Sequence, residues 1–384
     1  MEINIPRDEE QRLLAHLKGR TDAEARRMER YLSMPDLSRT PGSPLYDIAE
    51  RVKQAPAFSG FDIINIPEIV PTDISFDLFD FPPEHPARST SDTYYVDEKN
   101  ILRTHDTVFW YYYLNDPTVK ARIARGEAMG ALCYGKVYRK DEVDSRHMNV
   151  FHQFGGWYIA PLSQPVIPAD LHTALGEIVH AIFGPEMKYR INPDTFPYTD
   201  PSFEVELNVK GTAAEGPAKG EWLELLGSGM PKASVLKKMG VEGYHGWAFG
   251  FGIERPAIAS MALPDIRLLW STDERIKKQL MLGHVYKDVS KFPPSIRDIS
   301  FIVSKTFVPN DYFDTVRDIA GDLVEEVQLI DKYENDEKFG ADKMSYAYRI
   351  TYRSIERTLT SDEVEALHTR VEAATREEFG ATIR

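Results

Sequence analysis

The feature that most constrains the fold is the stretch from residue 81 to about residue 275, where short strand-like runs alternate with turns rich in Gly and Pro. Helical periodicity appears between these runs at 169–183, 233–239 and 256–261. The strand-like runs lie at 135–138, 150–158, 203–209, 222–226 and 247–253. Many antiparallel strands flanked by a few helices predict an α+β domain.

The C-terminal region shows a second pattern. It predicts strands at 291–304, 324–332 and 345–352, with helices at 312–323 and 361–379. This β-α-β-β-α order is close to a split-βαβ sandwich. A chain of 384 residues is also too long for one ordinary core. We therefore expect an N-terminal helical extension at 1–60, a main domain at 61–280, a linker at 281–290 and a second domain at 291–384.

The composition excludes several classes of protein. A single cysteine, Cys133, leaves no internal disulfide or cysteine-based zinc site, and it favours a reducing compartment. No run of about 18 apolar residues is present, so no membrane span is expected. The net charge of -14 argues against indiscriminate nucleic-acid binding, although a local basic face remains open. The acidic N-terminus is neither a secretory signal nor a transit peptide. We expect a cytoplasmic protein, or one of the mitochondrial matrix if a leader has been removed.

Two segments carry groups suited to binding an anion. In the first, at 138–156, Arg139 and Arg146 precede a strand-like run, and two strands joined by a charged loop can hold a guanidinium against a phosphate. In the second, at 246–267, alternating glycines leave room for a flat ligand on a sheet, and Arg255 stands at the start of a helix. A solvated hairpin turn and a Gly-bulged core strand are the structural alternatives.

These segments belong to a longer series of motifs with a family resemblance. The strings are HPAR at 85–88, DTYY at 92–95, LRTH at 102–105, FPYTDPS at 196–202, WLELLG at 222–227, GWAFGFGIER at 246–255 and DIRLLW at 265–270. The chain resembles phenylalanyl-tRNA synthetases from about residue 61 to its end, and the single-chain mitochondrial type most. The resemblance implies a class II synthetase sheet flanked by helices, followed by a ferredoxin-like anticodon-binding domain.

The resemblance also implies ATP-dependent attachment of L-phenylalanine to tRNA(Phe) through phenylalanyl-adenylate. Arg139 matches the arginine that lies against the α-phosphate, and Arg255 matches the one near the γ-phosphate, so these two are the expected catalytic residues. Mg²⁺ is expected with ATP, bound by Glu224 and Asp200, although the two-chain enzymes usually have Glu at the Asp200 position. Further ATP contacts are expected from Arg146, His147 and Met148.

For the amino acid, the resemblance implies an aromatic pocket and a polar end. The ring is expected among Phe196, Tyr198, Ala248 and Phe249. The polar end is expected to include His105, Thr107 and Gln153.

The sequence departs from the family pattern at this polar end. Trp110 stands where the family has Gln, and Gly155 stands where it has the Glu that meets the α-ammonium. We hypothesise that Asp106 supplies the missing negative charge.

The expected partners are phenylalanine and tRNA(Phe), with no membrane, and the chain is expected to be a monomer because it carries both domains. Candidate tRNA phosphate contacts are Lys291, Arg349, Arg353 and Arg357, for which solvated surface charge is an equally good explanation. Two other functions remain open. One is a class II paralogue that activates a different amino acid, and the other is an RNA-binding paralogue without catalysis. Retention of both phosphate arginines argues against the latter.

Overall fold

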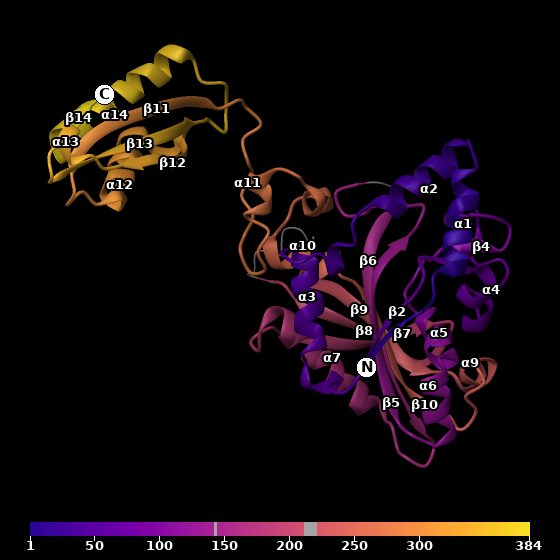
Figure 1. The fold of residues 1–384 in the computed structure, drawn as a ribbon. Coiled ribbons are helices and arrows are strands. Elements are labelled where there is room, and N and C mark those ends of the chain that lie inside the picture. Colours follow the sequence, from indigo (N-terminus) through magenta and orange to yellow (C-terminus); the bar gives the residue numbers. More distant parts are fainter. Residues whose placement is uncertain (142–143, 211–220) are drawn as a thin grey trace. The chain divides into compact units, whose positions relative to one another are not determined.

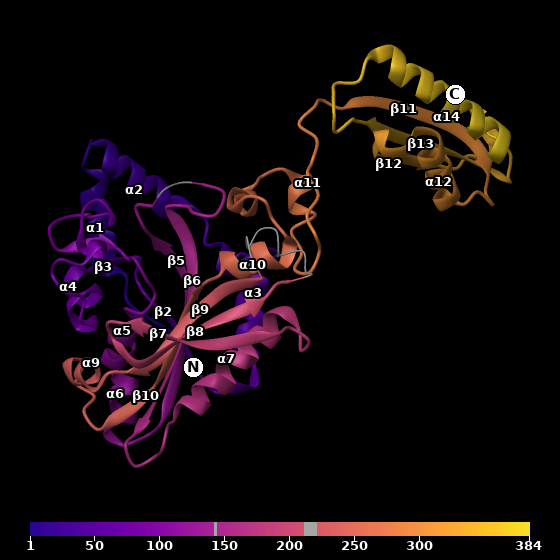
Figure 2. The same cartoon turned by 180° about the vertical axis from the view of Figure 1, so that it is seen from behind.

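The computed structural model describes residues 1–141, 144–210 and 221–384, which form two compact units, Met1–Tyr286 and Lys287–Arg384. Figures 1 and 2 show the fold from two sides. No helix among the described residues is long and apolar enough to cross a membrane. Each unit has its own sheet and its own helices.

A central sheet organises the first unit, and its described strands run in the order β1-β2-β5-β6-β10-β9-β8-β7. Parallel pairing joins β1 to β2 and β2 to β5, and every later pair is antiparallel. The bounds are β1 Glu2–Asn4, β2 Asp62–Asn65, β5 Met129–Tyr138, β6 Val150–Pro161, β7 Tyr189–Phe196, β8 Thr199–Asn208, β9 Trp222–Pro231 and β10 Tyr244–Gly252. The expected α+β class is confirmed.

The pairing of β6 with β10 decides which side chains face which side of the sheet. Gly155 pairs with Gly250, and Gly156 pairs with Phe249. Because successive side chains on a strand point to opposite faces, Ala248 and Gly250 share a face with Gly155. Phe249 lies on the other face, where its ring stacks 6.3 Å from that of Phe154. One face of these strands is therefore aromatic, and the other is open at its glycines.

Helices cover the sheet. In Figures 1 and 2, α3 (Pro44–Lys53) and α7 (Pro168–Phe183) lie side by side against it. Ser43 caps α3, with Pro44 at its first position, and Pro168 similarly begins α7. The other helices and strands of this unit are α1 Asp8–Lys18, α2 Ala23–Ser33, β3 Ile69–Pro71, α4 Thr72–Ser75, β4 Asn100–Leu102, α5 Phe109–Asn115, α6 Pro117–Ala124, α9 Ala233–Lys238, α10 Glu254–Met261 and α11 Glu274–Lys277.

The sequence predicts an N-terminal helical extension at 1–60, and its helices pack within the first unit. Strand β1 pairs with β2 inside the central sheet. Leu17 of α1 and Met28 of α2 are fully buried in one cluster with Tyr138 and Val150. Burying an apolar side chain of this size is worth about 1.5–3 kcal/mol. The N-terminal helices thus belong to the core of the first unit.

The second unit is a four-stranded sheet in the described residues, in the order β12-β13-β11-β14. Its core includes Phe301, Tyr312, Tyr348 and Val371, all essentially without exposed surface. The bounds are β11 Ser295–Ser304, α12 Pro309–Ala320, β12 Val324–Tyr333, α13 Asp336–Phe339, β13 Lys343–Tyr352, α14 Ser361–Phe379 and β14 Thr382–Ile383. The predicted β-α-β-β-α order is present, with the short α13 and β14 added.

Candidate active site

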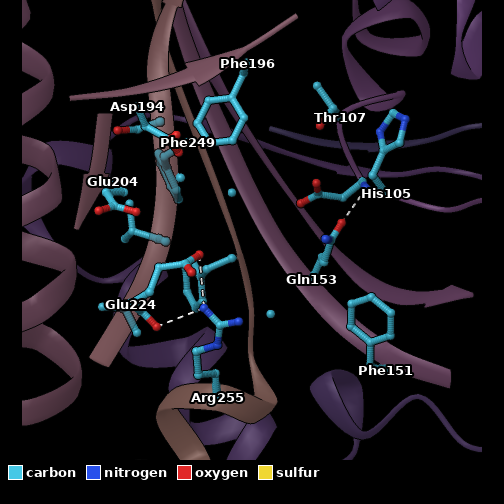
Figure 3. Close-up of a pocket in the computed structure, with 18 of the residues that line it drawn as sticks. His105, Thr107, Phe151, Gln153, Asp194, Phe196, Glu204, Glu224, Phe249 and Arg255 are labelled. Carbon is cyan, nitrogen blue, oxygen red and sulfur yellow. Dashed lines mark hydrogen bonds and ion pairs between the residues drawn. The ribbon is translucent and has the colours of Figure 1, made fainter. Parts of the chain in front are cut away.

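A large cavity lies over the glycine-bearing strands of the first unit, and Figure 3 shows side chains that line it. Its volume is about 1210 Å³. Small-molecule sites usually measure about 300–1,000 Å³. The cavity therefore has room for two small substrates, and its walls come from β6, β8, β9, β10, the start of α10 and the loop that contains His105.

Arg139 follows directly after β5, and its guanidinium is held in a fixed plane. Its Nε donates to the carbonyl oxygen of Thr104 at 3.0 Å. The guanidinium carbon lies 5.3 Å from the centre of the Phe151 ring, within the range of a cation–π contact. These two contacts orient the terminal nitrogens beside the cavity, where they can donate to a bound anion.

Arg255 lies in the first turn of α10. The preceding residue, Glu254, accepts from the main-chain nitrogen of His152 and pairs with its Nδ1 at 2.7 Å, which ties the start of the helix to β6. Arg255 Nη1 donates to the carbonyl oxygen of Glu224 at 2.9 Å and lies 3.1 Å from its Oε1. Figure 3 shows this pair across the cavity from Gln153 and Phe151. Both side chains of the pair are about half exposed, so a ligand can reach them.

The loop before β6 brings three predicted residues to the cavity, namely Arg146, His147 and Met148. Asp144 shapes this loop, because its Oδ1 accepts from the main-chain nitrogens of Arg146 and His147 at 2.6 and 2.8 Å. The hydrogen bond from the Arg146 main chain is the largest of the effects that hold the pKa of Asp144 low, at about 2. The Arg146 guanidinium stays exposed and can meet a ligand.

Carboxylates on the neighbouring strands could hold a metal ion. Glu224 lines the cavity as expected, and so do Glu204 and Glu206 of β8. Asn192 donates to Glu204 at 3.2 Å, and Arg190 lies 2.6 Å from Glu206. Carboxylate oxygens suit Mg²⁺, which is usually bound by one or two carboxylates together with phosphates. The described residues contain no group of three or more metal-binding side chains.

Asp200 differs from its expected place. Its side chain is exposed and does not line the cavity. The cause lies in β8, whose pairing with β9 is irregular between Thr199 and Ser202. Such an irregularity breaks the regular alternation of side chains along the strand. Glu204, which follows the irregular stretch, faces the cavity in place of Asp200.

Aromatic side chains form an apolar slot at another part of the cavity. Phe196 stacks on Tyr198 with ring centres 6.2 Å apart, and Trp110 meets Tyr198 edge-on at 6.0 Å. Trp110 is itself buried by stacking on Trp157 at 4.7 Å. Burial raises the pKa of Tyr198 to about 12, and its hydroxyl has the Thr107 side chain as a hydrogen-bonding partner. With Ala248 beside them, these rings suit a flat apolar group.

Phe249 differs from its expected place as well. It borders the cavity, but its ring packs with Phe58 and Phe154 on the opposite face of the sheet. The alternation of side chains along β10 requires this, because Ala248 faces the cavity. Phe249 therefore supports the slot from beneath.

The polar end of the cavity contains His105, Thr107 and Gln153 as expected. His105 Nε2 donates to the carbonyl oxygen of Ser75 at 3.0 Å, and burial lowers the pKa of this histidine to about 4. It is therefore neutral at pH 7, and its Nδ1 is buried without a partner among the described residues. Gln153 Oε1 accepts from the main-chain nitrogen of Asp106 at 2.9 Å. The amide is thereby oriented, with its nitrogen left to donate.

Gly155 lies beneath Asp106 and does not reach the cavity. A Cβ atom added to Gly155 would lie 2.9 Å from Asp106 Cγ, closer than ordinary van der Waals contact. Asp106 is 3% exposed and lines the cavity. Its carboxylate therefore fills the space that a side chain at position 155 would need.

Comparison with known proteins decides the family. Residues 31–280 match the description "tRNA synthetases class II core domain (F)", and residues 290–384 match "Ferredoxin-fold anticodon binding domain". The chloroplastic/mitochondrial phenylalanine--tRNA ligase of Arabidopsis thaliana is 38% identical over 328 residues, which span 82% of this chain and 71% of that protein. The mitochondrial phenylalanine--tRNA ligase of Mus musculus is 33% identical over 86% of this chain and 79% of its own length. This chain belongs to the phenylalanine–tRNA ligase family.

Similarity to a subunit of the family is more limited. The phenylalanine--tRNA ligase alpha subunit of Chlorobium phaeobacteroides is 34% identical over 246 residues, 62% of this chain and 69% of that subunit. The mitochondrial relatives match a larger share of this chain. The expected resemblance to the single-chain type of phenylalanine–tRNA ligase is confirmed, and so are the class II core and the ferredoxin-fold domain.

The predicted tRNA contacts lie in the anticodon-binding domain of this family member, and three of them already have partners. Arg349 forms an ion pair with Asp298 at 2.8 Å, and Arg353 forms one with Glu325 at 2.8 Å. Arg357 pairs with Glu363 at 2.6 Å. Lys291 is exposed, with its Nζ 5.7 Å from the ring centre of Phe292. Because the three arginines already form ion pairs, Lys291 is the most available of the four to bind an RNA phosphate.

Sequence reasoning missed several residues that line the cavity of this ligase-family chain. Phe151 could have been predicted, because it lies two residues from Gln153 on β6 and therefore faces the same side of the sheet. Glu204 and Glu206 are likewise two residues apart on β8, and both face the cavity. Asp194 gave no signal, because its strand reads as a polar loop.

Proposed function

We propose that this chain attaches phenylalanine to tRNA through a phenylalanyl-adenylate, in the same way as the ligases that it resembles. One observation supports this most strongly. Arg139 and Arg255, which come from segments far apart in the sequence, border one cavity that also contains the aromatic slot. Two guanidiniums that can hold a nucleotide, beside a slot that fits an apolar side chain, suit the adenylation of an apolar amino acid.

The proposed chemistry is an attack of the substrate carboxylate on the α-phosphate of ATP, with pyrophosphate leaving. Arg139, fixed by Thr104 and Phe151, neutralises charge that builds up at the α-phosphate. Arg255 holds the far end of the triphosphate. No protein nucleophile is needed, because positioning and charge neutralisation lower the barrier.

Magnesium fits this proposal through the carboxylates of the cavity. Glu224 is the proposed protein ligand, with Glu204 as the nearest substitute for the expected Asp200. The ion would supply additional positive charge to the phosphates. Since Glu224 already pairs with Arg255, the same carboxylate would also help to place that arginine.

The second unit is the proposed anticodon-binding part, and Lys291 is its proposed phosphate contact. Single-stranded bases are usually read by stacking and by their edges. We further propose that the chain acts as a monomer, since it carries both parts. The named relatives are mitochondrial or chloroplastic, which supports an organellar matrix as its compartment.

Aminoacylation of tRNA with a panel of amino acids tests the proposal. Phenylalanine is expected to give both ATP–pyrophosphate exchange and charged tRNA, with exchange lost on chelation of Mg²⁺ and restored by its return. The exposed Glu186, in the loop after α7, provides a control variant in E186Q. Preference for another amino acid, or tRNA binding with no adenylate from any amino acid, would refute the proposed function.

A further inference from the structure

Acidic side chains line the cavity at several points, and most of them are exposed, half-buried or paired. Glu224 pairs with Arg255, Glu254 with His152, and Glu206 with Arg190. The acidic side chains of the cavity wall are Asp106, Asp141, Asp194, Glu204, Glu206, Glu224 and Glu254. Asp106 is the buried one with a side-chain oxygen, Oδ2, that has no partner among the described residues.

Oδ2 of Asp106 has no hydrogen-bond donor among the described residues, although main-chain hydrogen bonds from Asp106 and Thr107 act on the carboxylate. It forms no ion pair within the described residues, although the charges of Arg103 and Arg139 act on it from a greater distance. The neighbouring His105 also leaves Nδ1, an acceptor in the tautomer that its bond to Ser75 requires, without a partner. Buried acceptors without donors, here on two residues that are consecutive in sequence, are expensive to maintain. Such a site is completed by a ligand that brings hydrogen-bond donors and positive charge.

An amino acid brings such a group. Its α-ammonium carries three donors and one positive charge, and its carboxylate suits the guanidinium of Arg139 and the free amide nitrogen of Gln153. Both lie near Asp106, since Gln153 accepts from the Asp106 main chain, and Arg139 donates to Thr104 and acts electrostatically on Asp106. The aromatic slot begins at Tyr198, whose hydroxyl is near enough to feel the charge of Asp106. An acidic, a basic and an apolar group thus surround one space.

We propose that Asp106 binds the α-ammonium of the amino-acid substrate, and that Gly155 makes the room in which its carboxylate lies. This inference rests on the proposed function and identifies the anionic group of its amino-acid site. Oδ2 packs against the α-carbon of Gly155, while Oδ1 lies 3.7 Å from the place of a Cβ on Gly250, a residue of the cavity wall. Asp106 and Gly155 therefore act as a pair, with the charge supplied by the loop and the space by the strand.

The test compares ligands with and without the ammonium group. The Michaelis constant for phenylalanine in ATP–pyrophosphate exchange is measured for the wild type, D106N, the double variant D106A/G155E and the control E186Q. Inhibition by 3-phenylpropionate, which lacks the ammonium, is measured alongside. Losing one partner of a buried charge pair costs at least about 2 kcal/mol, or about 30-fold. D106N should raise the constant for phenylalanine by about 30-fold or more and change that for ATP less than about twofold.

Binding of 3-phenylpropionate should not weaken in D106N, because this ligand has no group for the carboxylate to hold. A purely structural defect would weaken both ligands alike and would overturn the proposal. A Michaelis constant for phenylalanine that stays within about threefold of wild type in D106N would do the same. In D106A/G155E the carboxylate comes from the facing strand, and recovery of about tenfold or more is expected. If phenylalanine binding did not recover in D106A/G155E, the inference that Asp106 and Gly155 share one space would be overturned.

Failure of this inference is distinguishable from failure of the proposed function. If the wild type activates a different amino acid, the proposed function fails. Asp106 is then tested in the same way with that amino acid and its deaminated analogue. If the wild type activates phenylalanine and D106N does so equally well, the proposed function stands and the inference fails.

Discussion

Replacing Asp106 by Asn should stabilise the folded protein at alkaline pH while it weakens substrate binding. Burial raises the pKa of Asp106 from 3.8 to about 7, and the charges of Arg103 and Arg139 only partly oppose this. A carboxyl group with a raised folded-state pKa contributes stability below its unfolded pKa, and that stability is lost as the pH rises through the folded pKa. The wild type therefore carries a buried charge at pH 8 that the amide of Asn does not have.

The size of the effect follows from the shift. With pKa values of 3.8 in the unfolded and about 7 in the folded state, the shift costs about 4 kcal/mol at pH 8, where the group is ionised, and about 2 kcal/mol at pH 5, where folding requires its protonation. The new amide also adds donors, and burying them without a partner costs about 1–3 kcal/mol at any pH. The pH-independent part cancels when the two conditions are compared. D106N should therefore gain about 2–3 kcal/mol over the wild type between pH 5 and pH 8.

Urea unfolding followed by tryptophan fluorescence measures this gain. All five tryptophans lie within Met1–Tyr286, so the signal reports on the unit that contains Asp106. E186Q controls for removal of an exposed carboxylate, whose charge solvent screens, and should show a much smaller change with pH. A stability difference between D106N and the wild type that is the same at pH 5 and pH 8 would refute the reasoning. It would mean that Asp106 is not a desolvated charge in the free protein.

Three further predictions concern other residues of the two units. R139A and R255A should each lower the rate of pyrophosphate exchange by about 100-fold or more, because each removes preorganised positive charge; rates near that of the wild type would contradict their proposed positions. A248G should deepen the slot and increase exchange with para-substituted phenylalanines relative to phenylalanine, measured as a ratio of kcat/KM. K291A should raise the KM for tRNA while exchange stays unchanged, whereas R349A, which breaks an exposed ion pair, should lower stability by less than about 1 kcal/mol.

Much of the sheet could be predicted from the sequence because its strands have clear periodicity. The runs at 150–158 and 247–253 became β6 and β10, and the glycines of β10 identified the open face. Strand β7 could not be predicted, because YRINPDTF contains Pro, Asn and Asp, which are depleted in strands. Its pairing with β8 overrides that weak local preference. The N-terminal β1 depends in the same way on a partner distant in sequence.

In the site, too, residues placed by a local element could be predicted more readily than residues placed by pairing between strands. Arg139 and Arg255 could be predicted because each is placed by a local element, the end of β5 and the start of α10. The side that Phe249 faces followed from its alternation with Ala248 and could have been inferred. The irregular pairing that exposes Asp200 had a signal in the sequence, Pro201, because a proline inside a strand marks an edge or a bulge.

The two ends of the cavity also differ in how far their residue types can change. A triphosphate needs guanidiniums at places fixed by the main chain, and a hydrogen bond to Thr104 or Glu224 sets each one. An ammonium needs only one carboxylate within reach, and either of two facing backbones can provide it. Since the Asp106 carboxylate occupies the space over Gly155, a larger side chain at 155 would push that carboxylate out of its place. Without Asp106, the space would no longer require a glycine at 155. The residue types at 106 and 155 are therefore linked, and a larger side chain at one of them requires a smaller one at the other.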